Sequence, residues 1–151
     1  MSTKAVITSY EIERIDRFVN EYLREDLKKY DQFLSKTNAE IVEYIELKNI
    51  VKNIYEHMRS GFKTQMNIGG NFFVQAKVED TEHIMVNVGL DHYVNFTLDE
   101  ALKFSQLKIN QLNKEADVIR DKSIETRANI KLALLTIEEG RASMSAAATK
   151  S

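Results

Sequence analysis

Residues 69–104 read GGNFFVQAKVEDTEHIMVNVGLDHYVNFTLDEALKF, and this segment decides the fold. Within it, apolar and polar residues alternate, which is the two-residue period of a β-strand that buries one face. Clusters of Gly, Asn, Asp and Glu interrupt the alternation, as expected for turns. The same alternation already begins at Phe62. The pattern therefore predicts four short strands, most simply two successive β-hairpins over residues 62–97.

A helix is predicted immediately after the hairpins. Thr97 and Glu100 have the spacing of a capping box, in which each side chain accepts the backbone N–H of the other residue. From Leu98 to Ile137, apolar and small residues then recur at alternating steps of four and three, the 3.5-residue repeat of a coiled coil. We expect this helix to span about residues 98–140 and a mobile tail to follow over residues 141–151.

A second helix with the same repeat is predicted before the hairpins. The steps of four and three run from Leu23 to Met58, with only Thr37 and Lys48 polar. Upstream, the spacing continues in a frame shifted by one residue, through Ile12, Ile15, Val19 and Tyr22. This shift predicts a local adjustment of the helix register. Because the chain holds no proline, the residue that most strongly interrupts helices, we expect a helix over about residues 9–60, ended by Gly61.

The predicted fold class is mainly α, a long antiparallel α-helical coiled coil with two β-hairpins at the bend, and residues 1–151 form one domain. Two helices of similar length most simply fold back on each other, so that each covers the apolar seam of the other. Isolated hairpins are marginally stable in water, and their open edges invite pairing with other chains. We therefore expect strands of other subunits to complete the sheet. The candidate residues for subunit assembly are Phe72, Phe73, Val74, Val78, Ile84, Val86, Val88, Val94, Phe96 and Leu98.

The composition argues against several other classes of protein. The absence of cysteine removes disulfides, thiolate zinc sites and cysteine nucleophiles. A formal net charge of −2 and the lack of a basic region give no indication of direct nucleic-acid binding. His83 and His92 could face each other across a hairpin, but no further ligand is spaced to join them, so polar hairpin positions explain them better. We expect no metal, no cofactor and no enzymatic activity.

The N-terminal residues lack the apolar core of a signal peptide, and no run of residues approaches the length and apolarity of a membrane span. We therefore expect a chain of the cytoplasm or nucleus with no membrane partner.

Three motifs carry a resemblance to a known family. They are GGNFFV at residues 69–74, Asp80-Thr81 with the strand that follows, and TLDEALKF at residues 97–104. With these motifs the chain resembles the α-type subunits of prefoldin. The likeness spans nearly the whole chain as architecture, and Leu47-Lys48-Asn49-Ile50-Val51 is also similar. Glu79 stands where the family pattern has a proline in the middle turn.

The resemblance implies a hexamer of α- and β-type subunits, in which the hairpins form a joint β body and the coiled coils project from it. Such complexes hold unfolded proteins and pass them to a cytosolic chaperonin. One branch of the family, which the sequence resembles more narrowly, implies a prefoldin-like complex that assists the assembly of larger machines, with a nuclear role in transcription coregulation. The implied location is therefore the cytoplasm and the nucleus.

If the resemblance holds, client proteins should contact the free helix ends, where apolar side chains lack a full partner. The candidate residues for client binding are Ile7, Tyr10, Ile12, Ile15, Leu134, Leu135, Ile137 and Met144. Each of them could instead close the coiled coil. The alternative function is a coiled-coil scaffold or tether without client binding, which explains the helices equally well but leaves the alternating strands without a purpose.

Overall fold

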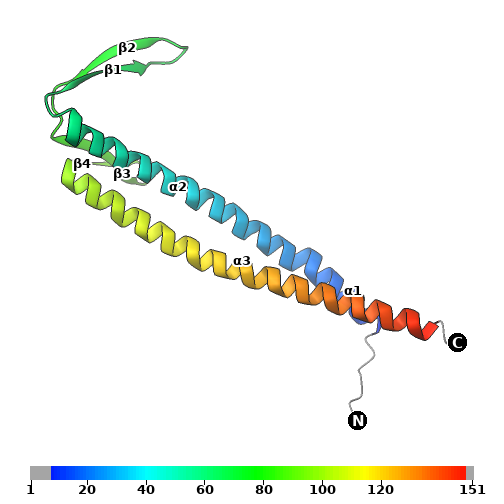
Figure 1. Cartoon of the computed structure of the whole chain (residues 1–151). Coiled ribbons are helices and arrows are strands. Elements are labelled where there is room, and N and C mark those ends of the chain that lie inside the picture. Colours follow the sequence, from blue (N-terminus) through cyan, green and yellow to red (C-terminus); the bar gives the residue numbers. More distant parts are fainter. Residues whose placement is uncertain (1–7, 149–151) are drawn as a thin grey trace. The chain divides into compact units, whose positions relative to one another are not determined.

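The computed structural model describes residues 8–148, which form long helices before and after two β-hairpins in the chain (Figure 1). The elements in chain order are α1 (Ser9–Phe18), the π-helix η1 (Val19–Leu23), α2 (Arg24–His57), β1 (Phe62–Asn67), β2 (Phe73–Val78), β3 (His83–Gly89), β4 (His92–Thr97) and α3 (Leu98–Ala148). The predicted mainly α fold with two antiparallel hairpins between the helices is confirmed. None of the described helices is apolar enough over a sufficient length to cross a bilayer.

The second helix continues further than the sequence pattern indicated. It was expected to end near Gly140, but α3 extends to Ala148, so the segment expected to be a mobile tail is helical up to that residue. Gly140 is buried, and a single glycine inside a helix costs only about 1 kcal/mol. Because alanine dominates the following turns, the helix propensity there is high enough to continue it.

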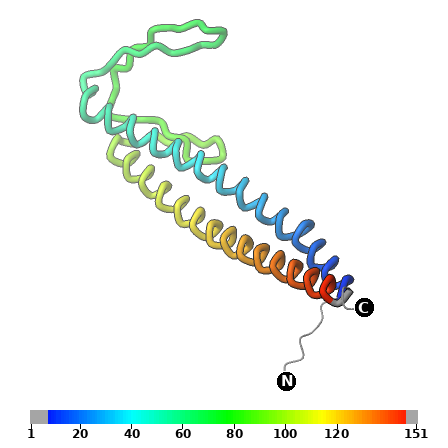
Figure 2. The backbone as a smooth tube through the Cα atoms, turned by 45° about the vertical axis from the view of Figure 1, so that its right-hand side comes forward, coloured from blue at the N-terminus to red at the C-terminus, as the bar shows by residue number. Residues whose placement is uncertain are grey.

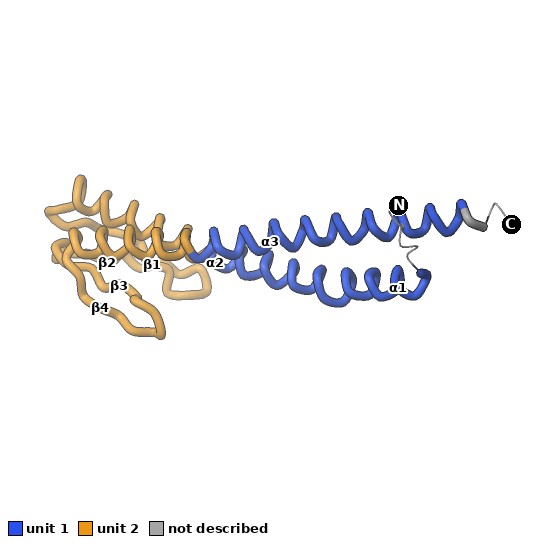
Figure 3. Tube along the Cα trace, turned by 90° about the horizontal axis from the view of Figure 1, so that it is seen from below, with its two compact units in different colours: residues 1–37, 115–151 blue, residues 38–114 orange. Residues whose placement is uncertain are grey.

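The chain divides into two compact units, coloured separately in Figure 3. One unit, called the helix-end unit here, comprises the chain up to Thr37 and the chain from Glu115 onward. The other, called the hairpin unit, spans Asn38–Lys114 and holds both hairpins.

In the helix-end unit, the N-terminal helical segment lies beside the C-terminal part of α3 (Figures 1 and 3). Arg127 of α3 donates a hydrogen bond from Nη2 to Asp31 Oδ1 of α2 at 3.3 Å. The buried side chains come from the predicted seams of both helices: Ile12, Val19, Thr37, Ala116, Ser123, Thr126 and Ile137. The seam prediction is therefore confirmed for this unit.

The predicted adjustment of helix register is present as the π-helix η1. The backbone N–H of Arg24 donates to the Val19 carbonyl, five residues earlier, where an α-helix would use a residue four earlier. The extra residue turns the apolar stripe back toward α3, so that Val19 is buried and Leu23 is half-buried. Tyr22 was expected in the seam, but its side chain is 60% exposed, because the π-helix gives this position to Leu23.

The core of the hairpin unit joins one hairpin to both helices. Its buried cluster consists of Val51 from α2, Val86 from β3, and Leu98 and Ala101 from α3. Half-buried side chains from all these elements surround the cluster, among them Leu47, Ile54, Ile84, Phe96, Leu102 and Phe104. The β3–β4 hairpin accordingly lies along the helices, as Figure 2 shows.

The capping box predicted at the start of α3 is confirmed. The Glu100 N–H donates to Thr97 Oγ1 at 3.3 Å, and the Thr97 N–H donates to Glu100 Oε2 at 2.9 Å. These bonds from the Thr97 backbone and hydroxyl hold the pKa of the Glu100 carboxyl below its usual value. A second box, not predicted, caps α1, where Thr8 and Glu11 make the same reciprocal bonds. Because the capping boxes give these N-terminal N–H groups hydrogen-bond partners, they define where both helices begin.

The two hairpins are separate two-stranded sheets, and no third strand pairs with either of them in the described chain. In the first, Phe62 pairs with Val78 and Asn67 with Phe73. The chain enters this hairpin through Gly61, which has a φ of +90° and lies beside the end of β2. A Cβ at Gly61 would approach the Val78 carbonyl oxygen to 2.7 Å, so both the left-handed backbone and the available space require glycine here.

Neighbouring residues of β3 provide a test of the packing between hairpin and helices. Val86 is 3% exposed and Met85 is 70% exposed. We expect Val86→Ala to lower the free energy of unfolding by about 2 kcal/mol, because it removes two buried methyl groups and leaves a cavity. Met85→Ala should change it by less than about 0.5 kcal/mol. Urea denaturation followed by circular dichroism at one protein concentration measures both, and equal losses would contradict this core.

The π-helix yields a second prediction. Deleting Asn20 removes the extra residue, so the upstream and downstream seams become one continuous repeat in an ordinary α-helix. We expect the urea midpoint of this deletion to stay close to that of the unaltered chain. The matched control deletes Ser35, an exposed residue of α2, and should lower the midpoint because it moves every upstream seam residue out of register. If deleting Asn20 lowers the urea midpoint as much as deleting Ser35, the interpretation of η1 as one extra residue between the two seams is wrong.

Candidate functional site

The β1–β2 hairpin exposes a cluster of large apolar side chains. Phe72, at its turn, is 71% exposed, and the other members are Met66, Ile68, Phe73 and Val74. Hydrogen bonds order the turn, since Asn67 Oδ1 accepts the Gly69 N–H at 2.8 Å and the Ile68 N–H donates to the Phe72 carbonyl at 2.9 Å. The register pairs Met66 with Val74 and Asn67 with Phe73, so Met66 and Val74 share one face of the hairpin and Phe73 lies on the other. Exposed apolar residues on an ordered hairpin with two open edges suit pairing with another chain. We call these five residues together the first-hairpin patch.

The β3–β4 hairpin differs, and here the sequence-based assignment needs a correction. Val86 and Leu98 were candidates for subunit assembly, but they are buried in the core of their own chain. Ile84 and Phe96 pack against the same core, and Val88 is half-buried. α2 and α3 cover much of the apolar face of this hairpin, but Val94, which pairs with Val86 on the same face, is 40% exposed. Among the remaining candidates, Phe72, Phe73, Val74 and Val94 are exposed, and Val78 is half-buried.

The outward face of the β3–β4 hairpin carries two exposed apolar residues that the sequence interpretation missed, Met85 and Tyr93. The register places them on one face, because Met85 pairs with Asn95 and Asn87 pairs with Tyr93. The alternation in the sequence already separates this face from that of Val86. The apolar pattern of this outward face is weak in the sequence, however, because two of the four outward positions are Asn87 and Asn95.

The connection between the hairpins is hydrogen-bonded to the turn that follows α2. The buried Thr81 donates its hydroxyl to the Arg59 carbonyl at 3.0 Å. Asp80 accepts the Glu82 backbone N–H at 2.8 Å, and this bond, followed by the nearby His83, lowers the pKa of the Asp80 carboxyl. The middle turn therefore has a defined conformation without the proline of the family pattern.

The structure does not bring the histidines of the hairpins together. His83 pairs with Thr97 at one end of the β3–β4 hairpin, and His92 pairs with Gly89 beside the turn at the other end. The expectation that they could face each other across the hairpin is wrong, because the antiparallel register separates them. Among the described residues, no group of three His, Cys, Asp or Glu side chains could hold a metal ion.

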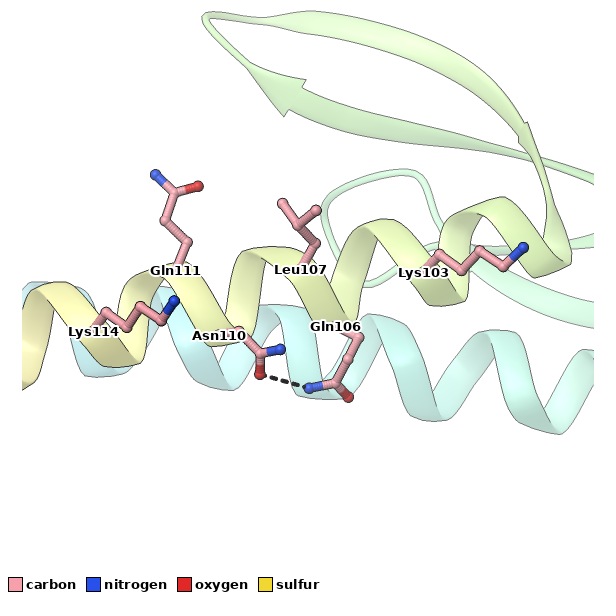
Figure 4. A pocket seen from close by; sticks show the side chains of 6 residues that line it. All are labelled: Lys103, Gln106, Leu107, Asn110, Gln111 and Lys114. Atoms are coloured by element: carbon pink, nitrogen blue, oxygen red, sulfur yellow. Dashed lines mark hydrogen bonds between the residues drawn. The ribbon is translucent and has the colours of Figure 1, made fainter.

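A shallow hollow lies on α3 and is lined by that helix alone (Figure 4). Leu107 stands at its centre among amides and lysines, and Gln106 donates from Nε2 to Asn110 Oδ1 at 2.9 Å. The other amide atom of Gln106, Oε1, accepts a hydrogen bond from Lys48 Nζ, one of the two polar members of the α2 seam. This hollow has no pair of groups placed for acid–base or nucleophilic chemistry. Its chemistry suits a surface contact.

The helix-end unit separates the candidate client-binding residues into two groups. Ile12 and Ile137 are buried between the helices, so they close the coiled coil, and Ile15 is half-buried. The exposed candidates are Tyr10, Leu134, Leu135 and Met144. Ile7 lies outside the described residues.

Tyr10, a predicted candidate, begins an exposed row on the N-terminal helix whose other members, Arg14, Phe18 and Tyr22, were not predicted as site residues. The Arg14 guanidinium lies over the Tyr10 ring at 5.9 Å, and the rings of Phe18 and Tyr22 stack at 5.7 Å. These four residues follow each other at steps of four, which is the signal that could have found them. A polar groove on the same helix is lined by Glu13, Asp16 and Arg17 among others, and by Arg141 of α3. Exposed aromatic and aliphatic groups beside polar ones suit weak contacts with extended chains.

Comparison with known proteins identifies relatives over most of the chain. A family model described as Prefoldin subunit matches residues 23–139. The chain is 36% identical to the protein UXT homolog of Dictyostelium discoideum over 106 residues, which cover 70% of this chain and 66% of that protein. It is 30% identical to protein UXT of Homo sapiens over 132 residues, which cover 87% of this chain and 84% of that protein.

The fold has a counterpart among solved structures. A chain in the cryo-EM structure of filamentous PFD from Methanocaldococcus jannaschii matches with a TM-score of 0.66 at 18% sequence identity. The match covers 80% of this chain and 98% of that one.

Proposed function

This chain belongs to the prefoldin subunit family, and from that premise we propose that it is a non-enzymatic subunit of a prefoldin or prefoldin-like co-chaperone complex. The family membership expected from the GGNFFV and TLDEALKF motifs is confirmed. In the proposed function, the chain assembles with other α- and β-type subunits through its hairpins, and the complex binds unfolded or unassembled proteins and aids their folding or assembly. The resemblance of the sequence supports two further parts of the proposal, a location in the cytoplasm and nucleus and a role in transcription coregulation.

The first-hairpin patch is the observation that carries the assembly step. Its aromatic side chains project into solvent from a hairpin with open edges. Two buried phenylalanines contribute about 3 kcal/mol or more to an interface, whereas in a lone chain they gain nothing. Backbone pairing at the open strand edges would add direction to this apolar contact.

For the assembly step, we expect the double substitution Phe72→Ser and Phe73→Ser to weaken complex formation at least about tenfold, because it removes both exposed aromatic side chains of the patch. Co-expression with β-type prefoldin subunits, followed by native mass spectrometry over a dilution series, measures this. Phe33→Ser, at an exposed phenylalanine of α2, is the matched control and should assemble normally. A stable, monodisperse monomer of the unaltered chain in the presence of these subunits would count against the proposed complex.

The exposed residues of the helix-end unit support the client-binding step. Tyr10, Leu134, Leu135 and Met144 offer apolar surface without a deep pocket. A single such surface binds weakly, but several subunits in one complex raise the effective affinity because their contacts act together. The alternative, a tether without client binding, gives these exposed side chains no role.

For the client-binding step, we expect a complex in which Tyr10→Ser, Leu135→Gln and Met144→Gln are combined to lose most of its capacity to suppress aggregation of a denatured protein. Light scattering of the client on dilution from denaturant measures this capacity. The control combines Val118→Gln and Ile124→Gln, which alter exposed residues elsewhere on α3, and should retain it. If the unaltered, assembled complex leaves the scattering unchanged, the tether is the better description.

A further inference from the structure

Two helix segments of the hairpin unit carry opposite charge. On α3, residues 101–114 include the lysines Lys103, Lys108 and Lys114 and no acidic residue. On α2, residues 38–57 include four glutamates and two lysines, and one of these lysines, Lys48, is bonded to Gln106 of α3. The same chain therefore presents one basic and one acidic helix surface.

The basic face is the hollow on α3 that Figure 4 shows. Its residues Lys103, Leu107, Asn110 and Lys114 follow one another at steps of four and three, so they lie along one side of the helix. All four are exposed, and Leu107, between the two lysines, is 62% exposed. The lysines are 11 residues apart in the sequence, which is about 16 Å along a helix. This face thus has a cation at each end, with an apolar group and an amide between them.

The acidic face lies on an exposed side of α2 and has a matching layout. Its residues Glu46, Asn49, Asn53 and Glu56 follow one another at steps of three and four, and all four are exposed. The glutamates are 10 residues apart in the sequence, about 15 Å along the helix. Ile50, beside the asparagines, is 55% exposed. This face has an anion at each end, with amides and an apolar group between them.

The two faces match in charge, in spacing and in their central groups. If the two helices lie side by side and parallel, three pairs come into register: Lys103 with Glu46, Leu107 with Ile50, and Lys114 with Glu56. Two oppositely charged pairs then enclose an apolar contact, and neighbouring amides can exchange hydrogen bonds. Complementary charges at both ends of a contact fix its register, because a shift along the helix separates both pairs.

The faces do not meet within one chain. There, α2 and α3 pack against each other through other residues, among them the buried Val51 and Ala101, and both faces stay exposed. We propose that the acidic face of α2 docks on the basic face of α3 in a second copy of this chain. Because two different surfaces meet, each copy keeps one face for a further copy. No hairpin residue takes part, so this contact is independent of the proposed assembly with other subunits.

Charge reversal tests the proposal in full-length chains that carry the double serine substitution in the first-hairpin patch, so that the patch does not contribute. Sedimentation velocity at low salt, over a concentration series up to about 1 mM, measures self-association. We expect Lys103→Glu with Lys114→Glu to weaken it about tenfold or more, because both ion pairs become repulsions. Glu46→Lys with Glu56→Lys should do the same. An equimolar mixture of the two variants should associate again, because each reversed face then meets a complementary one.

The matched control is Lys122→Glu with Lys131→Glu, which changes the net charge equally at exposed lysines outside the basic face, and it should associate like the parent chain. Adding about 1 M salt should weaken association of the parent, because it shortens the Debye length to about 3 Å. Circular dichroism checks the helix content of each variant. If a reversal lowers it, Lys103→Gln with Lys114→Gln replaces that variant and should still weaken association about threefold.

Three results would overturn the proposal. The first is a parent chain that stays monomeric up to the highest concentration. The second is a mixture of the two reversed variants that stays monomeric although the parent associates. The third is a loss of association in the lysine variant alone, because the basic face would then bind something other than α2. None of these results bears on assembly through the hairpins, which the experiments with other subunits test separately.

Discussion

The packing of Val86 against Val51 and Ala101 is the constraint on which the rest of the hairpin unit depends. It attaches the β3–β4 hairpin to both helices and covers much of the apolar face of that hairpin within the chain. The two hairpins are therefore not equivalent. One is part of the folded core, and the other carries the first-hairpin patch with no such cover.

The helix seams hold together although several of their residues are polar or small. Ser105 is fully buried, and its hydroxyl donates to the Ala101 carbonyl at 2.7 Å. Lys48 reaches Gln106 instead of entering the apolar seam as an unpaired charge. Because these polar groups have partners, their burial costs little, and small side chains let the helices approach closely. Such seams bind less strongly than leucine zippers, and the core of the hairpin unit supplements them.

The sequence predicted most of the fold because its two periods are unambiguous. Alternation gave the four strands, and the repeat of four and three gave both helix seams, including the shift that became η1. It failed where the answer depends on what lies opposite a residue. Whether Tyr22 or Leu23 enters the helix seam can be decided only when the packing partner is known. The same holds for which face of β3 packs against the helices. The turn at Leu90 shows the same limit, since alternation marks a turn but does not give its φ angles.

The seam contacts also bear on how the chain forms during its synthesis. Lys48 and Gln106 are 58 residues apart, and Asp31 and Arg127 are 96 residues apart. When the ribosome has finished α1 and α2, the helix that covers their apolar stripe has not yet been made. The loop between the nearer pair is shorter and costs slightly less entropy to close, which favours pairing that starts near the hairpins. Until α3 is complete, the apolar stripe of α1 and α2 is exposed to water, and transiently exposed apolar surface favours aggregation.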